Sequence, residues 1–206
     1  MKDTAIELPL SIKKLGNITD PGYCRYALDC VQVERMYDKT AFIASDGSTM
    51  SVVFDTSEDT KNRCMMNAGG MTSQLLHRDD IKKKIPTGKY NKNYLDSDTF
   101  EISTVKPGNE ASSSKATEGE GRFPRWTEVF KSNGETYLVD QKKKPEWTSC
   151  KLNVGRLKKI LDIYQAENID CVEVRILDDV TQAEFTGKSK DGTRTVACVL
   201  MCMTVD

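Results

Sequence analysis

Short apolar runs with alternating polar residues dominate the first quarter of the chain and predict strands. Residues 30–34 alternate with a period of two, and residues 41–44 and 51–54 are brief apolar runs on either side of an Asp46-Gly47 turn. Runs of this length joined by such a turn are typical of neighbouring antiparallel strands. We therefore predict an antiparallel meander in this part of the chain.

A second group of strands is predicted at the C-terminus. Its members are residues 171–177, 182–186 and 195–203, with an Asp191-Gly192 turn between the last two. The final run is apolar on both faces, which is typical of a strand that is covered on both sides.

Three segments show the spacing of amphipathic helices instead. They are residues 8–17, 78–85 and 153–165, and Asn153 is a suitable N-cap for the third. Each pairs an apolar stripe with a basic cluster. The basic residues of the three predicted helices are Lys13, Lys14, Lys82, Lys83, Lys84, Arg156, Lys158 and Lys159.

Composition indicates a soluble globular protein of one large or two small domains. The 206 residues are 38% hydrophobic, and 30 Lys and Arg balance 31 Asp and Glu to a net charge of −1. Any basic surface must therefore be local. The N-terminus has no apolar core of a targeting signal, and no apolar run approaches the ~20 residues of a membrane span, so we expect a cytoplasmic protein with no membrane partner.

The sequence offers little for catalysis, metals or cofactors. His77 is the only histidine, which leaves no second histidine for a catalytic or metal-binding pair. No phosphate-binding glycine loop occurs. The seven cysteines have irregular spacing, and those in apolar runs (Cys30, Cys171 and Cys198) are expected to be buried thiols. We therefore expect no enzyme activity, no metal and no cofactor; carboxylate-only metal chemistry stays open.

Two polar stretches suggest where the chain divides. Residues 104–122 are rich in Gly, Ser and Glu and predict a flexible loop, and residues 141–145 form a basic linker or hairpin tip. We expect one domain over residues 1–135 and a second domain or half-domain over residues 136–206. The alternative is a single domain with an insertion over residues 76–140.

Two segments resemble a known family in the same order. Residues 25–53, with their Asp46-Gly47 turn, resemble the middle domain of the bacterial replicative sliding clamp, the β subunit of DNA polymerase III. Residues 121–129 (Gly-Arg-Phe-Pro-Arg-Trp-Thr-Glu-Val) resemble the Phe-Pro segment of that clamp.

The end of the chain continues this resemblance. Residues 153–164, 172–176 and 199–203 resemble the clamp's last helix, a strand, and its Val-x-Met-Pro-Met ending. The resemblance implies an α+β, DNA-clamp-like fold of antiparallel sheets with a few short helices packed on one face. In that fold the helices line a central hole, so the eight basic residues named above would contact the phosphates of duplex DNA without reading its sequence.

The resemblance also implies a pocket that binds short peptides of polymerases or repair factors. The residues that match the pocket are Ser45, Gly47, Met50, Pro124, Val129, Val199 and Met201. The alternative is that all seven pack a domain junction. The chain departs from the family at Ser48 and Thr49, where the clamp has His-Arg, at Glu128 in place of Arg, and at Cys202 in place of Pro. These changes remove positive charge near the pocket.

The function implied by the resemblance is that of a noncatalytic sliding clamp, which tethers replication or repair partners to DNA as a processivity factor. A bacterial clamp chain has three domains and closes its ring as a dimer, whereas this chain has one and a half to two. We therefore expect self-association, with a trimer as the assembly that would complete a ring of six domains. The alternative is a clamp-fold interaction module that has lost the ring and does not bind DNA.

Overall fold

The computed structural model describes residues 4–20, 26–66, 72–86, 88, 91–108, 111–129, 150–176 and 182–203. The strands are β1 (Ala5–Glu7), β2 (Cys30–Arg35), β3 (Thr40–Ser45), β4 (Thr49–Asp55), β5 (Thr72–His77), β6 (Lys92–Asp96), β7 (Glu101–Val105), β8 (Ala111–Lys115), β9 (Glu173–Ile176), β10 (Gln182–Lys188) and β11 (Arg194–Met201). The helices are α1 (Ile12–Ile18), α2 (Glu58–Met66), α3 (Arg78–Lys84), α4 (Trp126–Val129) and α5 (Val154–Ala166).

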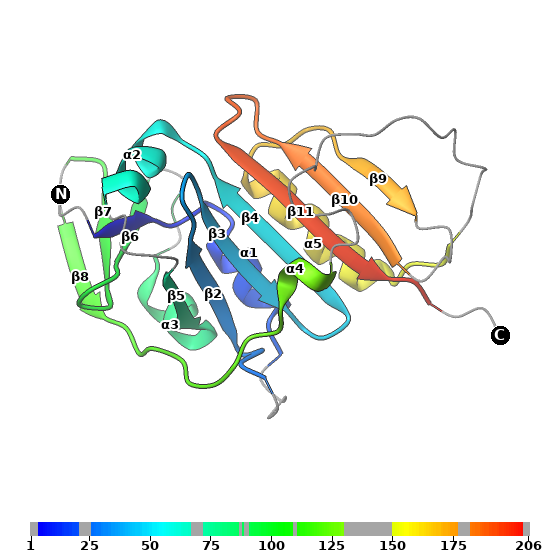
Figure 1. Cartoon of the computed structure of the whole chain (residues 1–206), viewed down its shortest axis with the longest axis horizontal. Coiled ribbons are helices and arrows are strands. Elements are labelled where there is room, and N and C mark those ends of the chain that lie inside the picture. The colour runs from blue at the N-terminus through cyan, green and yellow to red at the C-terminus, as the bar shows by residue number, and fades with distance from the viewer. Residues whose placement is uncertain are drawn as a thin grey trace.

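Two antiparallel sheets organise these elements (Figure 1). The larger sheet has seven strands in the order β5-β2-β3-β4-β11-β10-β9, and the smaller has four in the order β1-β6-β7-β8. Together with the few short helices, they make the α+β antiparallel architecture that the sequence predicted. The seven-stranded sheet runs across the predicted boundary at residues 135 and 136, because β11 pairs with β4.

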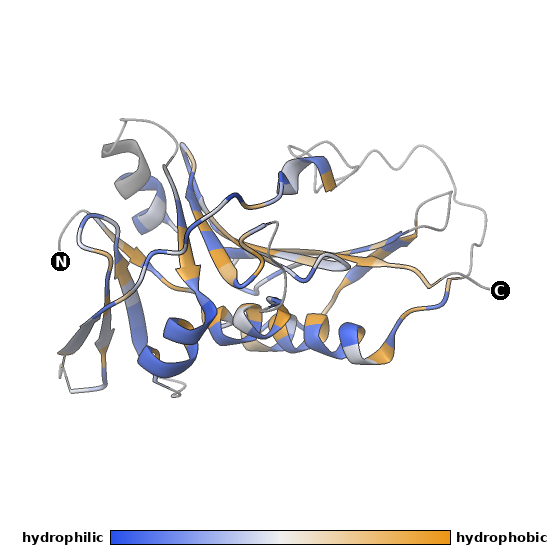
Figure 2. Ribbon diagram, turned by 90° about the horizontal axis from the view of Figure 1, so that it is seen from below, coloured by the Kyte–Doolittle hydropathy of each residue, from blue (hydrophilic) through white to orange (hydrophobic). Residues whose placement is uncertain are grey.

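Both faces of the large sheet are covered at its centre. Alternate residues of β3 point to opposite sides: Phe42 joins a core with α1, α3 and α5, while Ile43 joins a second core under α4. Strand β11 alternates in the same way, with Cys198 on the helix side and Val199 on the α4 side. This double covering explains why the final apolar run lacks a polar face. Figure 2 shows α3 and α5 on one side of the sheet and α4 on the other.

Most predicted elements are confirmed, with shifted ends. The third predicted helix is α5, and the side chain of its N-cap Asn153 accepts a hydrogen bond from the Arg156 N–H at 3.1 Å. The first predicted helix, over residues 8–17, began too early: α1 begins at Ile12, and the Leu8 N–H donates to the Asn93 carbonyl instead of entering a helix. Cys171 is exposed and not buried as predicted, because it lies just before β9 at the end of the sheet.

The flexible loop predicted for residues 104–122 is wrong for residues 111–115, which form β8 against β7. Its sequence, Ala-Ser-Ser-Ser-Lys, has no apolar alternation because the strand is an exposed edge held by backbone pairing. In the described part of residues 76–140, β6, β7 and β8 complete the sheet that β1 begins. No helix in the described ranges is long and apolar enough to span a membrane.

Candidate functional site

The register of the large sheet builds one wall of an apolar pocket. Ser45 of β3 lies opposite Met50 of β4, and Met50 lies opposite Val199 of β11. Because directly opposed residues share a face of the sheet, these three side chains form one row. Each comes from a segment that the sequence singled out, and the pairing of β4 with β11 brings the segments together.

A tight turn between β3 and β4 closes one end of this pocket. The Asp46 carboxylate accepts hydrogen bonds from the N–H groups of Ser48 (2.9 Å) and Thr49 (2.6 Å). Gly47 has a φ of +81°, a conformation that favours glycine over other residues. The N–H of Met201 donates to the Ser48 carbonyl at 3.1 Å and so fixes the end of β11 to the turn.

Helix α4 forms the opposite rim and is anchored from both ends. The indole N–H of Trp126 donates to the buried Glu34 carboxylate at 2.8 Å, and the Trp126 ring packs on Phe54 with centroids 5.8 Å apart. At the other end, the Gln182 amide donates to the Val129 carbonyl at 3.4 Å. These contacts hold Pro124 and Val129 over the sheet.

The resulting pocket has a volume of about 440 Å³. Its lining comprises Tyr26, Leu28, Ser45, Asp46, Gly47, Ser48, Thr49, Met50, Pro124, Val129, Val199 and Met201. All seven residues assigned from the resemblance therefore lie on one cavity. Tyr26 and Leu28 were missed, because the strand signals begin only after them. Such a mainly apolar hollow with a few polar groups suits a short peptide or a small molecule.

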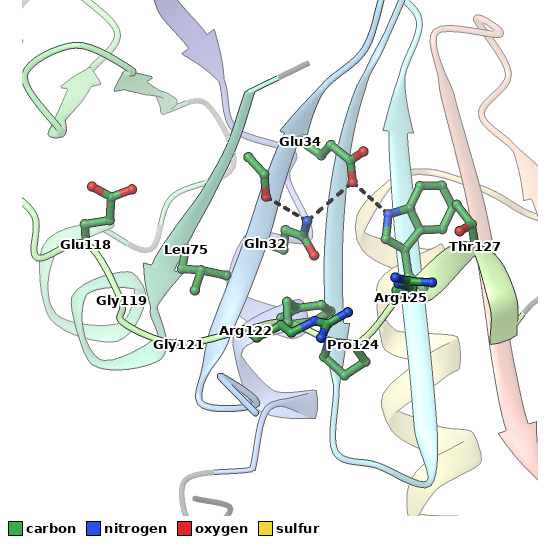
Figure 3. A pocket seen from close by; sticks show the side chains of 13 residues that line it. Gln32, Glu34, Leu75, Glu118, Gly119, Gly121, Arg122, Pro124, Arg125 and Thr127 are labelled. Carbon is green, nitrogen blue, oxygen red and sulfur yellow. Dashed lines mark hydrogen bonds between the residues drawn. The ribbon is translucent and has the colours of Figure 1, made fainter. Parts of the chain in front are cut away.

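A second pocket, of about 550 Å³, adjoins the first across Pro124 (Figure 3). Its floor is a polar chain in which the Gln32 amide donates to the Ser73 hydroxyl at 2.7 Å and to Glu34 at 3.4 Å. Arg122 and Arg125 lie at its rim. The sequence analysis did not identify this pocket, because its residues come from two strands (β2 and β5), the segment before α4 and α4 itself, which only the tertiary structure brings together.

The basic residues lie on the opposite side of the sheet from the apolar pocket. Helix α1 contacts both α3 and α5, so the three helices form one row. Within it Lys82, Lys83, Lys158 and Lys159 are exposed. The three helices that carry the predicted basic clusters therefore lie side by side.

Four of the predicted phosphate ligands lie within ion-pair distance of carboxylates. Lys83 lies 3.6 Å from Asp79 of the same helix. Lys14 lies 3.5 Å from Asp162 of α5, and Lys84 lies 2.5 Å from Asp80. Arg156 is turned toward the turn of the apolar pocket, where its Nε lies 3.9 Å from Asp46. In the described part of the chain no three His, Cys, Asp or Glu side chains converge as metal ligands would.

Antiparallel sheets backed by short helices, with a continuous sheet that joins neighbouring units, define the DNA-clamp class of folds. Among solved structures, the chain is similar to DNA polymerase III β sliding clamps. A Pseudomonas aeruginosa clamp with a bound ligand aligns with a TM-score of 0.63 and 14% identity over 100% of this chain and 68% of that one. The fold is therefore a sliding-clamp fold.

Two further structures agree with this assignment. The DNA polymerase III subunit β of Pseudomonas aeruginosa aligns with a TM-score of 0.62 and 14% identity over 98% of this chain and 66% of that one. A Helicobacter pylori β clamp in complex with diflunisal aligns with a TM-score of 0.58 and 10% identity over 98% and 66%. The chain thus spans about two thirds of the clamp chains. No protein-family model and no curated protein sequence matches it.

Proposed function

We propose that this protein is a noncatalytic, sliding-clamp-like protein that binds duplex DNA nonspecifically and tethers replication or repair partners. The observation that carries the proposal is the arrangement of α1, α3 and α5 as one row with exposed lysines on one face of the sheet. The apolar pocket lies on the other face, so DNA and a partner peptide would bind without competing for the same surface.

DNA binding of this kind would depend on charge and not on base sequence. Lysines on short helices reach phosphates, and each neutralised phosphate releases counterions, which makes the affinity fall steeply with salt. Lys82, Lys83, Lys158 and Lys159 would contribute most, because all four are exposed, whereas Lys14 and Lys84 are half-buried beside carboxylates. The pair of Lys83 with Asp79 is exposed and therefore weak. The net charge of −1 is compatible with such a local surface.

The test of DNA binding is a salt titration of the full chain with a fluorescein-labelled duplex, read by anisotropy. We expect Lys82→Ala with Lys83→Ala to lower the slope of log K against log salt by about 2, since each phosphate contact contributes about 0.9. Lys188→Ala is the matched control. Phe185 of β10 faces the core on the helix side, and Lys188, three residues later, is exposed on the opposite face of the strand. An unchanged slope in the double variant would contradict the proposal.

The test of tethering is binding of a labelled pentapeptide with two apolar side chains. Met201→Glu places a charge on the pocket wall and should weaken binding at least about tenfold. Met203→Glu is its control, because Met203 is equally exposed but does not line the pocket. Equal losses in both variants would contradict a peptide site here.

A second function is favoured by the carboxylates that pair with Lys14 and Lys84, because a cation that is already paired gains less from contact with a phosphate. We also propose, as the alternative, a clamp-fold interaction module that binds peptides in this pocket without DNA. It predicts normal peptide binding and no affinity for the duplex at low salt. The trimer expected from two domains per chain stays a prediction.

A further inference from the structure

The second pocket has apolar walls. Leu75 of β5, Phe123 and Trp126 line it with buried side chains, and Pro124 lines it at the border with the apolar pocket. An aliphatic chain can lie along such walls while a polar group at its end reaches the floor. The lining therefore favours a long side chain over a bare ion.

The floor of the second pocket holds a buried carboxylate whose partners are neutral. Glu34 is 8% exposed, and its Oε2 accepts hydrogen bonds from the Trp126 indole at 2.8 Å and from the Gln32 amide at 3.4 Å. Within the described residues Glu34 has no ion-pair partner. Because buried charges in proteins are normally paired with an opposite charge, a cationic group would complete the charge balance of this floor.

The Gln32 amide adds a second acceptor to the floor. A carboxylate can only accept hydrogen bonds, so the amide nitrogen faces Glu34, and it also donates to the Ser73 hydroxyl at 2.7 Å. The amide oxygen points away from Glu34 (Figure 3), is buried, and has no hydrogen-bond partner among the described residues. The floor therefore has more acceptors than donors and suits a group with several N–H donors.

The charges at the rim largely cancel one another. Arg125 is paired with Glu128 at 2.9 Å, and Glu118 and Arg122 are exposed residues of opposite charge. Solvent screens exposed charges more strongly than buried ones. The buried Glu34 carboxylate therefore decides the sign of the group that the pocket accepts.

We propose that the second pocket binds an arginine side chain of a partner polypeptide, with the guanidinium on Glu34 and the methylene stem along Leu75 and Phe123. A guanidinium is planar and carries five N–H donors, so it matches a carboxylate through two bonds, whereas an ammonium is a point charge. The occupant belongs to a polypeptide because Pro124 lines both pockets, so a chain that passes over Pro124 can contact both. The site is defined without the apolar pocket and does not rest on the function proposed above.

The test is a titration of the isotope-labelled full chain with Nα-acetyl-arginine-N-methylamide, followed by heteronuclear NMR at the indole N–H signal of Trp126. This N–H donates to Glu34, so a guanidinium on the carboxylate should shift its signal. The chain has two tryptophans, and Trp147→Phe assigns the signal. We expect the arginine derivative to bind at least about tenfold more tightly than the matching citrulline derivative, which has a similar shape but no charge.

Glu34→Gln should abolish this preference for arginine. The new amide oxygen still accepts the indole N–H of Trp126, but it carries no charge. Glu184→Gln is the matched control, because Glu184 is also a buried glutamate that accepts a hydrogen bond from a glutamine amide, that of Gln182 at 3.2 Å, but it does not line the pocket. The control should keep the preference.

Ser73→Lys is a second variant, which leaves Glu34 in place. Ser73 is exposed and lies directly opposite Glu34 in the pairing of β5 with β2, so a lysine there can pair with the carboxylate from within the chain. This variant should raise the dissociation constant of the arginine derivative at least about tenfold.

The outcomes separate clearly. Equal binding of the arginine and citrulline derivatives overturns the proposal, as does a preference that Glu34→Gln and Ser73→Lys leave intact or that Glu184→Gln removes. If Glu34→Gln alters the circular dichroism spectrum, Ser73→Lys decides. Tighter binding of the corresponding glutamate derivative would assign the pocket to anions through Arg122 and overturn the proposal.

Free L-arginine tests the source of the side chain. If it binds more tightly than the capped derivative, the occupant is a free amino acid and the polypeptide partner is wrong. None of these measurements uses DNA or the apolar pocket, so failure of the function proposed above would not bear on this result.

Discussion

The Nε atom of Arg156 lies 3.9 Å from Oδ2 of Asp46, and this pair connects helix α5 to the turn that closes the apolar pocket. The other oxygen of Asp46 accepts the two turn N–H groups of Ser48 and Thr49. One carboxylate therefore both shapes the pocket and links it to a helix of the basic row.

Asp46→Ala is expected to loosen this turn and weaken binding of the apolar pentapeptide. Loss of two backbone hydrogen bonds should lower the free energy of unfolding by about 1–2 kcal/mol, measured by urea titration. Asp191→Ala is the control, because Asp191 accepts the Thr193 N–H in the distant β10–β11 turn. The control should keep peptide affinity, and a peptide affinity unchanged in Asp46→Ala would argue against this role.

Arg194→Met is expected to lower the free energy of unfolding by about 3–5 kcal/mol, because it leaves a buried carboxylate without its cation. Arg194 at the start of β11 pairs with Asp55 of β4, whose side chain is 2% exposed. Its Nε also lies 4.0 Å from Glu167, which accepts the Ser11 N–H at 2.6 Å. The network thereby ties β11 and the end of α5 to β4 and to the start of α1.

The matched control for that measurement is Lys190→Ala. Lys190 pairs with Asp170 at 2.7 Å, but both side chains are largely exposed, so its loss should leave the urea midpoint unchanged. Similar midpoints for Arg194→Met and Lys190→Ala would show that the buried network adds little.

Acid is expected to destabilise the protein partly through Asp80. Burial disfavours the charged form of this carboxylate, but the Lys84 ammonium and the Thr117 N–H outweigh it, and the pKa of Asp80 lies below its usual value. The ionised Asp80 carboxylate therefore stabilises the folded protein at pH values above about 4, the pKa of Asp in the unfolded chain. This stabilisation is lost as the pH falls through the lower pKa of Asp80 in the folded protein. Urea titrations between neutral and acidic pH should show a shallower acid decline for Asp80→Asn; identical declines would exclude this contribution.

The cysteines are expected to react in order of exposure. Burial raises the pKa of Cys198 to about 12, although hydrogen bonds with Ser51 and Tyr164 act to lower it. Burial, and then the negative charge of Asp29, raise the pKa of Cys30 to about 12. Both thiols therefore stay protonated near pH 8 and react slowly. Among the cysteines whose exposure the structure describes, iodoacetamide labelling followed by peptide mass spectrometry should modify exposed Cys171 first. Early modification of Cys198 would indicate that β11 opens readily.

Local pattern predicted the elements with strong periodicity. Helix α5 follows from its apolar stripe and the Asn153 cap, and β11 follows from its long apolar run. Strand β8 could not be predicted, because three consecutive serines carry no burial signal and the strand is held mainly by backbone pairing with β7. The contact of Trp126 with Glu34 was also out of reach, since it joins a short helix to a distant strand.

The sequence by itself determined where apolar residues are buried, which helices carry lysines, and, through the resemblance, which segments contribute to the apolar pocket. Only the tertiary structure decided that Ser45, Met50 and Val199 form one row, and that α1 packs against both α3 and α5. The reason is that periodicity records which residues leave water but not what they contact. Register and neighbours are set by pairing between strands far apart in the chain.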